Sequence, residues 1–321
     1  MNVLVTGGGG YIGSFMVKAL CDRGDNVYVL DSFERGFRDA VDTRAEIIEG
    51  NLLDQGFVAQ TFNRVSMDAI IHFAGLISVA ESVKKPGIYF ESNIMGALNI
   101  LDAIKEKNIK FIFSSTAAVY GNPIQIPIPE EHPKNPTSPY GVSKLMVEDI
   151  LKWYNQIFGQ RYIILRYFNA SGAALDGSMG ERHNPETHII PIAIDAALHD
   201  REFRIFGNDY DTRDKTCERD YIHVLDLVQA HILALESDVD IKGGSFNVGS
   251  GHGYTNKEVV EMVEKISGKK LQVTQRERRL GDPARLVADV SKINEQLHFD
   301  TRYSDLETIV KSAYAWHTKD A

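Results

Sequence analysis

The first twenty residues constrain the fold of this chain more than any other segment. Residues 2–6 form an apolar, β-branched run of strand length, four glycines beginning at Gly7 follow at once, and a helical apolar pattern runs on from Gly13. Strand, glycine turn and helix in this order are the context of a dinucleotide fingerprint, although Gly7, Gly10 and Gly13 are spaced G-x-x-G-x-x-G rather than G-x-G-x-x-G. Glycine permits a tight turn and a close approach of the backbone to pyrophosphate. We expect pyrophosphate to bind at the helix N-terminus.

A second strand-like run, residues 26–30, ends at Asp31. A carboxylate at this place accepts hydrogen bonds from the adenosine ribose hydroxyls and repels a 2′-phosphate, which favours NAD over NADP. Arg35 and Arg38 follow closely and are able to hold a phosphate, so the preference for NAD stays open at this point. An acid at a strand end also suits a plain helix cap.

Tyr140 and Lys144 stand four residues apart, so on a helix they share one face and their polar groups meet over a common substrate. A phenol is a poor base near neutral pH because its pKa is about 10. A neighbouring ammonium favours the phenolate, and a helix N-terminus, for which Pro139 is suited, adds positive potential. We therefore expect Tyr140 to accept a proton beside a hydride acceptor. The same pair also occurs by chance on solvated helix faces.

Composition excludes several classes of protein. The chain has 321 residues, of which 43% are hydrophobic and 25% charged, as in ordinary globular proteins. A net charge of −9 disfavours nonspecific binding to nucleic acid or to an anionic membrane. Two cysteines are too few for a disulfide scaffold, and His183, His188 and His223 lack metal-ligand spacing, so we expect no metal. With no leader pattern and no apolar run of ~18 residues, the expected compartment is the cytoplasm.

Strand-like runs alternate with helical patterns through the first half of the chain. This alternation predicts right-handed crossovers and an α/β fold, a doubly wound parallel sheet of the Rossmann type with helices on both faces. Polar and glycine motifs follow the strand ends, where ligands of such sheets bind. The expected strands are residues 2–6, 26–30, 46–49, 69–73, 110–114 and 162–167, with helices such as 86–107 and 143–158 between them.

The regular alternation breaks near residue 170. We expect residues 1–169 to form an NAD-binding Rossmann domain, with return segments near 220–250, and residues 170–321 to form a second, smaller α/β domain that binds the substrate. In the second half, helices are expected at residues 190–199, 224–237 and 256–267, and strands at 203–206 and 246–248. The helix at 224–237 and the strand at 246–248 are expected to return to the first sheet.

Beyond these patterns, the sequence resembles the extended short-chain dehydrogenase/reductase superfamily and, within it, the UDP-glucose 4-epimerase family. The resemblance covers essentially the whole chain, and its more specific motifs lie in the second half. The matching segments are residues 6–14, 72–75, 113–121, 139–144, 165–169, 206–210, 219–224 and 279–283.

The resemblance implies that Tyr140 is the catalytic base, that Lys144 is its electrostatic partner, and that Thr116 binds the sugar. Asn51 stands where the family more often has Asp, and Ile77 where several members have Lys. The implied NAD contacts are Gly7, Gly10, Tyr11, Ile12, Asp31, Ser32, Asn51, Leu52, Phe73, Ala74, Gly75, Ile77, Asn93, Tyr140, Lys144 and Phe168. The implied UDP-sugar contacts are Thr116, Asn169, His188, Ile189, Arg204, Phe206, Arg219, Arg279 and Asp282.

The activity implied is NAD-dependent inversion at C4, which interconverts UDP-glucose and UDP-galactose through a transient 4-keto sugar. A dehydratase or decarboxylase needs further acid–base groups where this chain has Ala117 and Ala118. An epimerase of a UDP-N-acetylhexosamine or UDP-uronate stays open, because Leu286 is intermediate in size at a pocket position. A non-catalytic NAD-binding protein is the remaining alternative. Family members are commonly homodimers through helices near residues 93–107 and 143–158, so a homodimer is expected.

Overall fold

The computed structural model describes residues 1–237, 244–279 and 282–319. Leu280 and Gly281, which belong to one of the matching segments, lie outside the described residues. The chain forms two compact units. The first comprises Met1–Gly121, Lys134–Arg166 and Val228–Phe246, and the second comprises Asn122–Pro133, Tyr167–Leu227 and Asn247–Ala321. Each unit is therefore assembled from segments that are far apart in the sequence.

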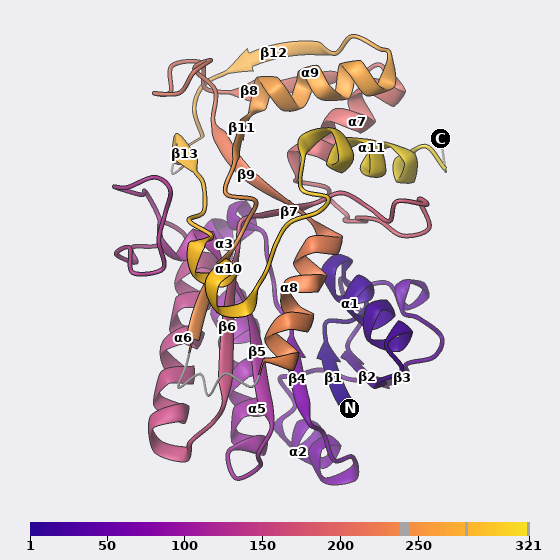
Figure 1. Ribbon diagram of the computed structural model, residues 1–321, viewed down its shortest axis with the longest axis vertical. Helices are drawn as coiled ribbons and strands as arrows, with labels where there is room; N and C mark the ends of the chain where they lie inside the picture. Colours follow the sequence, from indigo (N-terminus) through magenta and orange to yellow (C-terminus); the bar gives the residue numbers. More distant parts are fainter. Residues whose placement is uncertain (238–243, 280–281, 320–321) are drawn as a thin grey trace. The chain divides into compact units, whose positions relative to one another are not determined.

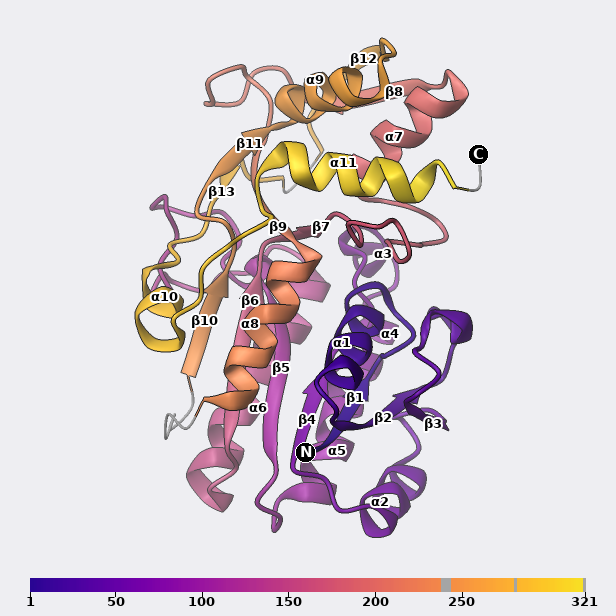
Figure 2. The ribbon, with the colours of Figure 1, turned by 45° about the vertical axis from the view of Figure 1, so that its right-hand side comes forward.

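A seven-stranded sheet forms the centre of the first unit, in the order β10-β6-β5-β4-β1-β2-β3 (Figures 1 and 2). The pairs β1–β2, β1–β4, β2–β3 and β4–β5 are parallel. The strand order reverses between β1 and β4, which is the switch point at which doubly wound sheets bind ligands. The strands are β1 (Asn2–Thr6), β2 (Asn26–Asp31), β3 (Glu46–Glu49), β4 (Ala69–His72), β5 (Lys110–Thr116), β6 (Tyr162–Tyr167) and β10 (Gly244–Val248).

Helices cover both faces of this sheet. They are α1 (Tyr11–Asp22), α2 (Gln55–Arg64), α3 (Val79–Lys84), α4 (Pro86–Phe90), α5 (Gly96–Ile104), α6 (Pro139–Phe158) and α8 (Val224–Glu236). Alternate strand residues face opposite sides: Leu4, Ile70 and Phe111 pack with apolar residues of α2, α5 and α6. In both views α1 and α8 lie in front of the strands, on the other face (Figures 1 and 2). Lys110 Nζ donates to the carbonyl oxygens of Ala234 and Leu235 at the end of α8, at 3.2 and 2.8 Å.

The helix expected over residues 86–107 is interrupted. α4 passes into a π-helical turn, η2 (Glu91–Met95), before α5 begins. Asn93 within that turn is buried, and its side chain binds Leu76 and Ser143 rather than facing solvent. Local π geometry of this kind commonly accompanies functional sites. The break was not predicted because the sequence pattern here is continuously helical.

The second unit contains shorter sheets and its own core. β9 pairs with β7, β11 and β13, and β8 pairs in parallel with β12. Ile194, Val259 and Ile309 belong to the core between α7, α9 and α11. The elements are β7 (Asn169–Ser171), α7 (Ile189–His199), β8 (Glu202–Phe206), β9 (Glu218–His223), β11 (Gly253–Thr255), α9 (Asn256–Ser267), β12 (Gln272–Arg276), β13 (Arg285–Leu286), α10 (Ser291–Leu297) and α11 (Leu306–His317). The first unit also contains two short 3-10 turns, η1 (Arg38–Ala40) and η3 (Ala117–Val119).

The predicted fold class, a doubly wound parallel sheet, is confirmed, as is the return of a late strand, β10, to the first sheet. Residues 122–133, which we had assigned to the first domain, belong to the second unit. The functional division into an NAD domain and a substrate domain stays a prediction.

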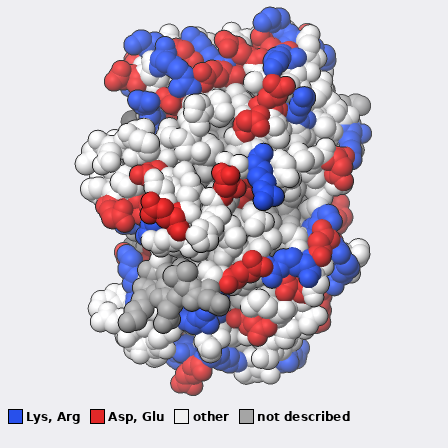
Figure 3. All heavy atoms as spheres, in the orientation of Figure 1, with Lys and Arg blue, Asp and Glu red and all other residues white. Residues whose placement is uncertain are grey.

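The surface carries charges of both signs. Lys and Arg side chains are intermixed with Asp and Glu on the face shown in Figure 3, and several are paired, as Lys265 with Glu307 at 2.7 Å and Arg276 with Glu202 at 2.9 Å. Among the described residues, none of the helices has the length and apolar character needed to cross a membrane.

Candidate functional site

The glycine turn between β1 and α1 is too tight for side chains. Gly7 has a φ of +72°, which favours glycine, and a Cβ there would stand 2.7 Å from a backbone nitrogen that follows β4. A Cβ at Gly13 would stand 2.1 Å from the Gly7 carbonyl oxygen. Gly10 is the N-cap of α1 and supplies no side-chain cap. The first N–H groups of a helix have no acceptors within the helix itself, so this end of α1, where Tyr11 and Ile12 lie, is suited to an anion.

Asp31 ends β2, and the turn holds its carboxylate. Oδ2 accepts from the Gly9 N–H at 2.8 Å, and Oδ1 accepts from the Phe33 N–H at 2.8 Å. An ionised carboxylate has about four acceptor sites, so about two remain for ribose hydroxyls. Ser32 lies beside it, with its hydroxyl 3.5 Å from the Glu34 amide nitrogen.

Arg35 and Arg38, which left the choice between NAD and NADP open in the sequence, are each paired with an acidic side chain. Arg35 Nη2 lies 3.1 Å from a carboxylate oxygen of Glu81. Arg38 pairs with Glu49 and lies 5.4 Å from the centre of the Phe33 ring. Because these pairs are exposed, each stabilises the protein by less than about 1 kcal/mol and would yield to a phosphate. The preference for NAD therefore depends on Asp31.

Asn51 and Leu52 follow β3. The Asn51 side chain donates to Glu34 at 3.2 Å and accepts from the Leu53 N–H at 2.9 Å. The Leu52 carbonyl accepts from Asn99 Nδ2 at 2.8 Å, which ties this loop to α5. The Asn51 side chain, which the resemblance implies as an NAD contact, thus has partners within the protein.

The loop after β4 carries four further predicted residues. Phe73 and Ala74 are half-buried, whereas Gly75 and Ile77 are exposed. Asn93 binds this loop through its side chain. Its Oδ1 accepts from the Leu76 N–H at 2.8 Å, and its Nδ2 donates to Ser143 Oγ at 2.9 Å. Asn93 therefore joins the end of β4 to α6.

The residues expected to carry the chemistry meet at the end of β5. Ser138 caps α6, since its Oγ accepts from the Gly141 N–H at 3.2 Å, and Tyr140 is the second residue of the helix. The Tyr140 hydroxyl shares a hydrogen bond with the Thr116 side chain. Lys144 is buried one turn later, and its Nζ donates to the Ser114 carbonyl at 2.9 Å. Because Ser114 and Thr116 are two residues apart on one strand, Tyr140 and Lys144 face the same strand end.

The charge state of this group differs from our expectation. Burial raises the pKa of Tyr140, and the hydrogen bond with Thr116 offsets only part of that effect. Burial also lowers the pKa of Lys144 to about 8. We expected the lysine to favour the phenolate, but its ammonium instead donates to a carbonyl and lies 5.0 Å from the centre of the Phe113 ring. The two side chains alone therefore do not make Tyr140 a ready base.

A buried ion pair behind this group escaped the sequence reasoning. Arg166 of β6 donates to both oxygens of Glu148 of α6, at 2.9 and 2.7 Å, and neither side chain is more than 2% exposed. Glu148 also accepts from Ser115 Oγ at 2.6 Å, and Arg166 donates to the Tyr120 hydroxyl at 2.9 Å. The network fixes α6 against β5 and β6. Glu148 lies four residues beyond Lys144, a spacing that could have suggested it.

Within the second unit, the structure brings Phe206 and Arg279 together. The Arg279 guanidinium lies 3.9 Å from the centre of the Phe206 ring at the end of β8, so one face of the ring is covered. Arg219 of β9 donates to the Pro283 carbonyl at 2.9 Å. The Asp282 N–H donates to the Arg279 carbonyl at 3.3 Å.

The remaining second-unit residues are more dispersed. Arg204 is exposed and pairs with Glu202 at 2.6 Å. Asn169 Nδ2 donates to the Asp220 carbonyl at 2.8 Å, and Phe168 precedes it. Arg204 lies two residues before Phe206 on β8.

His188 precedes α7, and Ile189 is the first residue of that helix. His188 Nδ1 lies 2.7 Å from Glu181 Oε1 and 3.1 Å from Glu186 Oε1, and His183 Nδ1 lies 3.0 Å from the same Glu181 oxygen. The expectation that these histidines bind no metal stays a prediction, although folding brings His183 and His188 to the same pair of acids. His223 is buried and shares hydrogen bonds with Leu225 and Ser312, as expected for a structural histidine.

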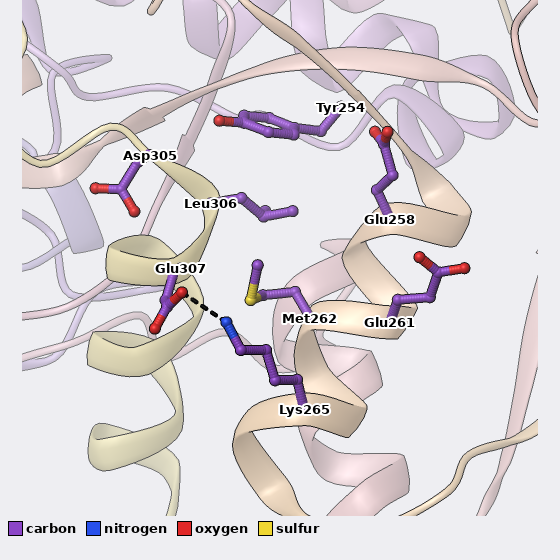
Figure 4. A pocket seen from close by; sticks show the side chains of 8 residues that line it. All are labelled: Tyr254, Glu258, Glu261, Met262, Lys265, Asp305, Leu306 and Glu307. Atoms are coloured by element: carbon purple, nitrogen blue, oxygen red, sulfur yellow. Dashed lines mark hydrogen bonds and ion pairs between the residues drawn. The ribbon is translucent and has the colours of Figure 1, made fainter.

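A surface hollow between α9 and α11 contains none of the predicted residues. Figure 4 shows Lys265 and Glu307 paired across it, with Met262 and Leu306 at its base. The lining is Tyr254, Glu258, Glu261, Met262, Lys265, Asp305, Leu306 and Glu307.

A family model of NAD dependent epimerases and dehydratases matches residues 3–249, which include the glycine turn, Tyr140 and Lys144. The chain belongs to the NAD dependent epimerase/dehydratase family. The family membership inferred from the motifs is thereby confirmed.

Relatives in the epimerase/dehydratase family match the chain along its length. A UDP-glucose 4-epimerase of Lacticaseibacillus casei is 45% identical over 320 residues, which cover 99% of this chain and 97% of that protein. A solved UDP-glucose 4-epimerase from Brucella ovis in complex with NAD has a TM-score of 0.93 at 43% identity and covers 98% of this chain and 97% of its own. One from Bifidobacterium longum in complex with NAD+ and UDP has a TM-score of 0.95 at 34% identity, with 100% and 99% covered.

The first unit of this epimerase/dehydratase family member suits the dinucleotide for which the family is named. The turn leaves no room for a Cβ at Gly7 or Gly13, as a backbone that approaches a pyrophosphate requires. The uncapped start of α1 offers amide donors, and the Asp31 carboxylate retains acceptor sites. These are the residues that would hold NAD.

Proposed function

We propose that the chain is a UDP-glucose 4-epimerase that uses NAD and interconverts UDP-glucose and UDP-galactose. The observation that carries the proposal is the meeting of Tyr140, Thr116 and Lys144 at the end of β5, in a unit whose glycine turn suits a dinucleotide. The full-length match to UDP-glucose 4-epimerases supports this choice over other members of the family.

In this proposal, Tyr140 accepts the proton of the sugar C4 hydroxyl and returns it at the end of the cycle. Thr116 holds the Tyr140 hydroxyl in place through their hydrogen bond. Lys144, fixed by the Ser114 carbonyl, keeps a positive charge within the same buried region. Bound NAD supplies a hydride acceptor at the sugar C4 and a positive charge.

The raised pKa of Tyr140 links its activity to cofactor binding. Burial disfavours the phenolate in the protein alone, whereas an added positive charge nearby favours it. We therefore expect Tyr140 to be a stronger base in the enzyme that holds NAD than in the free protein.

The UDP group would bind in the second unit. Arg219 and Arg279 are suited to a diphosphate because guanidinium–phosphate bonds are charge-assisted and geometrically specific. Phe206 offers uracil one ring face, since Arg279 covers the other. Asp282 would accept from the ribose hydroxyls. Binding through UDP leaves the hexose free to turn, so that either face of C4 can be presented.

The test is the turnover of UDP-galactose by a Tyr140→Phe variant. General acid–base catalysis typically contributes 10²–10⁴-fold, so we expect a loss of about that size with bound NAD retained. The matched control is Tyr154→Phe on the same helix, whose hydroxyl donates to Asp102 on the surface at 2.8 Å. Near-normal turnover by Tyr140→Phe would contradict the assignment of the base.

Substrate choice has its own experiment. Wild-type enzyme is assayed with UDP-galactose and UDP-N-acetylgalactosamine at matched concentrations, and we expect a clear preference for the first. Exclusive use of the N-acetylated sugar would overturn the choice. A non-catalytic protein would leave both sugars unchanged while still binding NAD.

We propose in addition that the enzyme is a homodimer. α6 exposes Met146, Trp153 and Ile157, which recur at helical spacing on one face, and Met95 before α5 is also exposed. Exposed apolar side chains gathered on one helix face are typical of an interface. Light scattering should give twice the chain mass for the wild type and a monomer for Trp153→Glu. A wild-type monomer would refute the proposal.

We place the enzyme in the cytoplasm, where thiols stay reduced. Cys21 and Cys217 are both buried and unpaired with each other, which suits a reducing compartment.

A further inference from the structure

The segment before α7 gathers four side chains that ordinarily ligate metals. Glu181, His183, Glu186 and His188 each direct one possible ligand atom into the same space, and these atoms all lie within 4.8 Å of one another. Glu181 is only 4% exposed. All four residues belong to the second unit.

The distances between these atoms are close to the distances between neighbouring ligands of a four-coordinate metal ion. Glu181 Oε1 lies 3.0 Å from His183 Nδ1 and 2.7 Å from His188 Nδ1. His183 Nδ1 lies 3.8 Å from Glu186 Oε2. Four ligands at about 2.0–2.2 Å from a tetrahedral zinc ion are separated from one another by roughly 3.3–3.6 Å. Small movements of side chains would therefore bring all four onto one ion.

The surrounding structure fixes these ligands in advance. The Glu181 carbonyl accepts from Trp316 Nε1 at 3.0 Å, which anchors the segment to α11. Glu186 Oε1 accepts from the N–H groups of Thr187 and His188, at 2.7 and 2.8 Å, and this leaves Oε2 for another partner. Glu181 Oε1 is buried, and two imidazole nitrogens, Nδ1 of His183 and Nδ1 of His188, lie within 3.0 Å of it.

From this geometry we propose that Glu181, His183, Glu186 and His188 bind one Zn²⁺ ion in each chain. Two carboxylates and two neutral imidazoles carry a charge of −2, which a dication neutralises. Imidazole nitrogen together with carboxylate oxygen suits zinc, whereas Mg²⁺ and Ca²⁺ prefer oxygen ligands alone. A zinc ion on Nδ1 would leave the proton of His188 on Nε2 and so fix its tautomer.

The competing interpretation is a network of ion pairs in which protons replace the metal. In that network a protonated His188 would pair with Glu181 across the 2.7 Å between Nδ1 and Oε1, and a protonated His183 would pair with the same oxygen across 3.0 Å. Two imidazolium rings would then stand with their centres 5.3 Å apart and repel each other, whereas one Zn²⁺ removes that repulsion.

The experiment uses the full chain without an affinity tag and without sugar, so its outcome is independent of the proposed epimerase activity. Protein stripped with a chelator is dialysed against Zn²⁺, and bound metal is measured by mass spectrometry. We expect one Zn²⁺ per chain and a rise in Tm. Co²⁺ in its place should give the visible bands of a tetrahedral site.

Three variants complete the test. His183→Gln and Glu181→Gln should each weaken Zn²⁺ binding by at least about 100-fold, since even indirect ligand contacts are worth 10–100-fold. His199→Gln is the matched control, because His199 faces a single carboxylate, that of Asp195, at 3.0 Å on the surface; it should bind as the wild type does. Folding of each variant is checked by circular dichroism. Wild-type protein without stoichiometric Zn²⁺, or equal binding by His183→Gln, would overturn the proposal in favour of the ion-pair network.

Discussion

Replacement of Glu148 by glutamine is expected to destabilise the first unit strongly. Glu148 accepts from Arg166 at two oxygens and from Ser115, and both charged side chains are almost wholly removed from solvent. Glutamine is nearly the same size but neutral, and its NH₂ group would face the guanidinium of Arg166 with donor against donor. The substitution therefore removes one charge and leaves the buried Arg166 guanidinium without its carboxylate partner.

The magnitude follows from this desolvation. Removing one partner of a buried ion pair typically costs 3–5 kcal/mol, because the remaining charge is no longer compensated. An exposed pair contributes only 0–1 kcal/mol. Asp149→Asn, at the next position of α6, provides that comparison, since Asp149 pairs with Lys152 at 2.7 Å on the surface. We expect about 3–5 kcal/mol for Glu148→Gln and less than about 1 kcal/mol for Asp149→Asn.

The assay is urea unfolding followed by circular dichroism, combined with hydrogen–deuterium exchange of β5 and β9 peptides. Exchange should rise in β5, which the network braces, and stay unchanged in β9 of the second unit. The double variant Glu148→Leu/Arg166→Met should recover much of the lost stability, because a buried pair replaced by apolar residues is often neutral. A cost below about 1 kcal/mol for Glu148→Gln, or a double variant as unstable as the sum of its singles, would refute the reasoning.

Three further predictions concern the glycine turn, the lysine and the UDP site. Gly13→Ala should abolish co-purification of NAD, measured by absorbance at the nucleotide band, because its Cβ would meet a carbonyl at 2.1 Å; Gly87→Ala, where a Cβ meets nothing within 4 Å, should retain it. In NAD-free protein, burial of the Lys144 ammonium lowers the free energy of unfolding at pH values below its lowered pKa of about 8. This destabilisation is relieved as the pH rises from 8 toward 10.5. The wild type should therefore gain about 3 kcal/mol of unfolding free energy relative to Lys144→Met over that range, and a difference that does not vary with pH would contradict this. Arg279→Ala should weaken UDP binding about 10–100-fold by calorimetry, given 1.5–3 kcal/mol for a hydrogen bond to a charged group, whereas Arg278→Ala, whose side chain pairs with Asp209 at 2.6 Å, should not.

Much of the fold could be predicted because the central strands are apolar and end in glycine or polar residues. β1, β4 and β5 are buried along nearly their whole length, and such runs stand out in a sequence. The start of α6 could be located from Pro139, although the capping role of Ser138 was not predicted. The return of β10 followed from its alternation with the preceding helix.

Other elements left no comparable pattern. β12 reads Gln-Val-Thr-Gln-Arg and is mostly exposed, so it lacks the alternation of a half-buried strand, and no strand was predicted there. The spacing of Glu148 from Lys144 places both on one face of α6, but no sequence pattern identifies Arg166, on a separate strand, as the partner of Glu148. The raised pKa of Tyr140 could not be predicted either, because it depends on how deeply folding buries the hydroxyl.

The place of β10 at the edge of the large sheet has a consequence for synthesis on the ribosome. β10 comprises Gly244–Val248 and pairs with β6, which is complete by residue 167. In a nascent chain, the edge of β6 that later pairs with β10 therefore has no partner strand while some eighty further residues are translated. Such an open edge invites pairing with another polypeptide, so chaperone engagement or slowed elongation in this interval would decide how much of the product escapes aggregation.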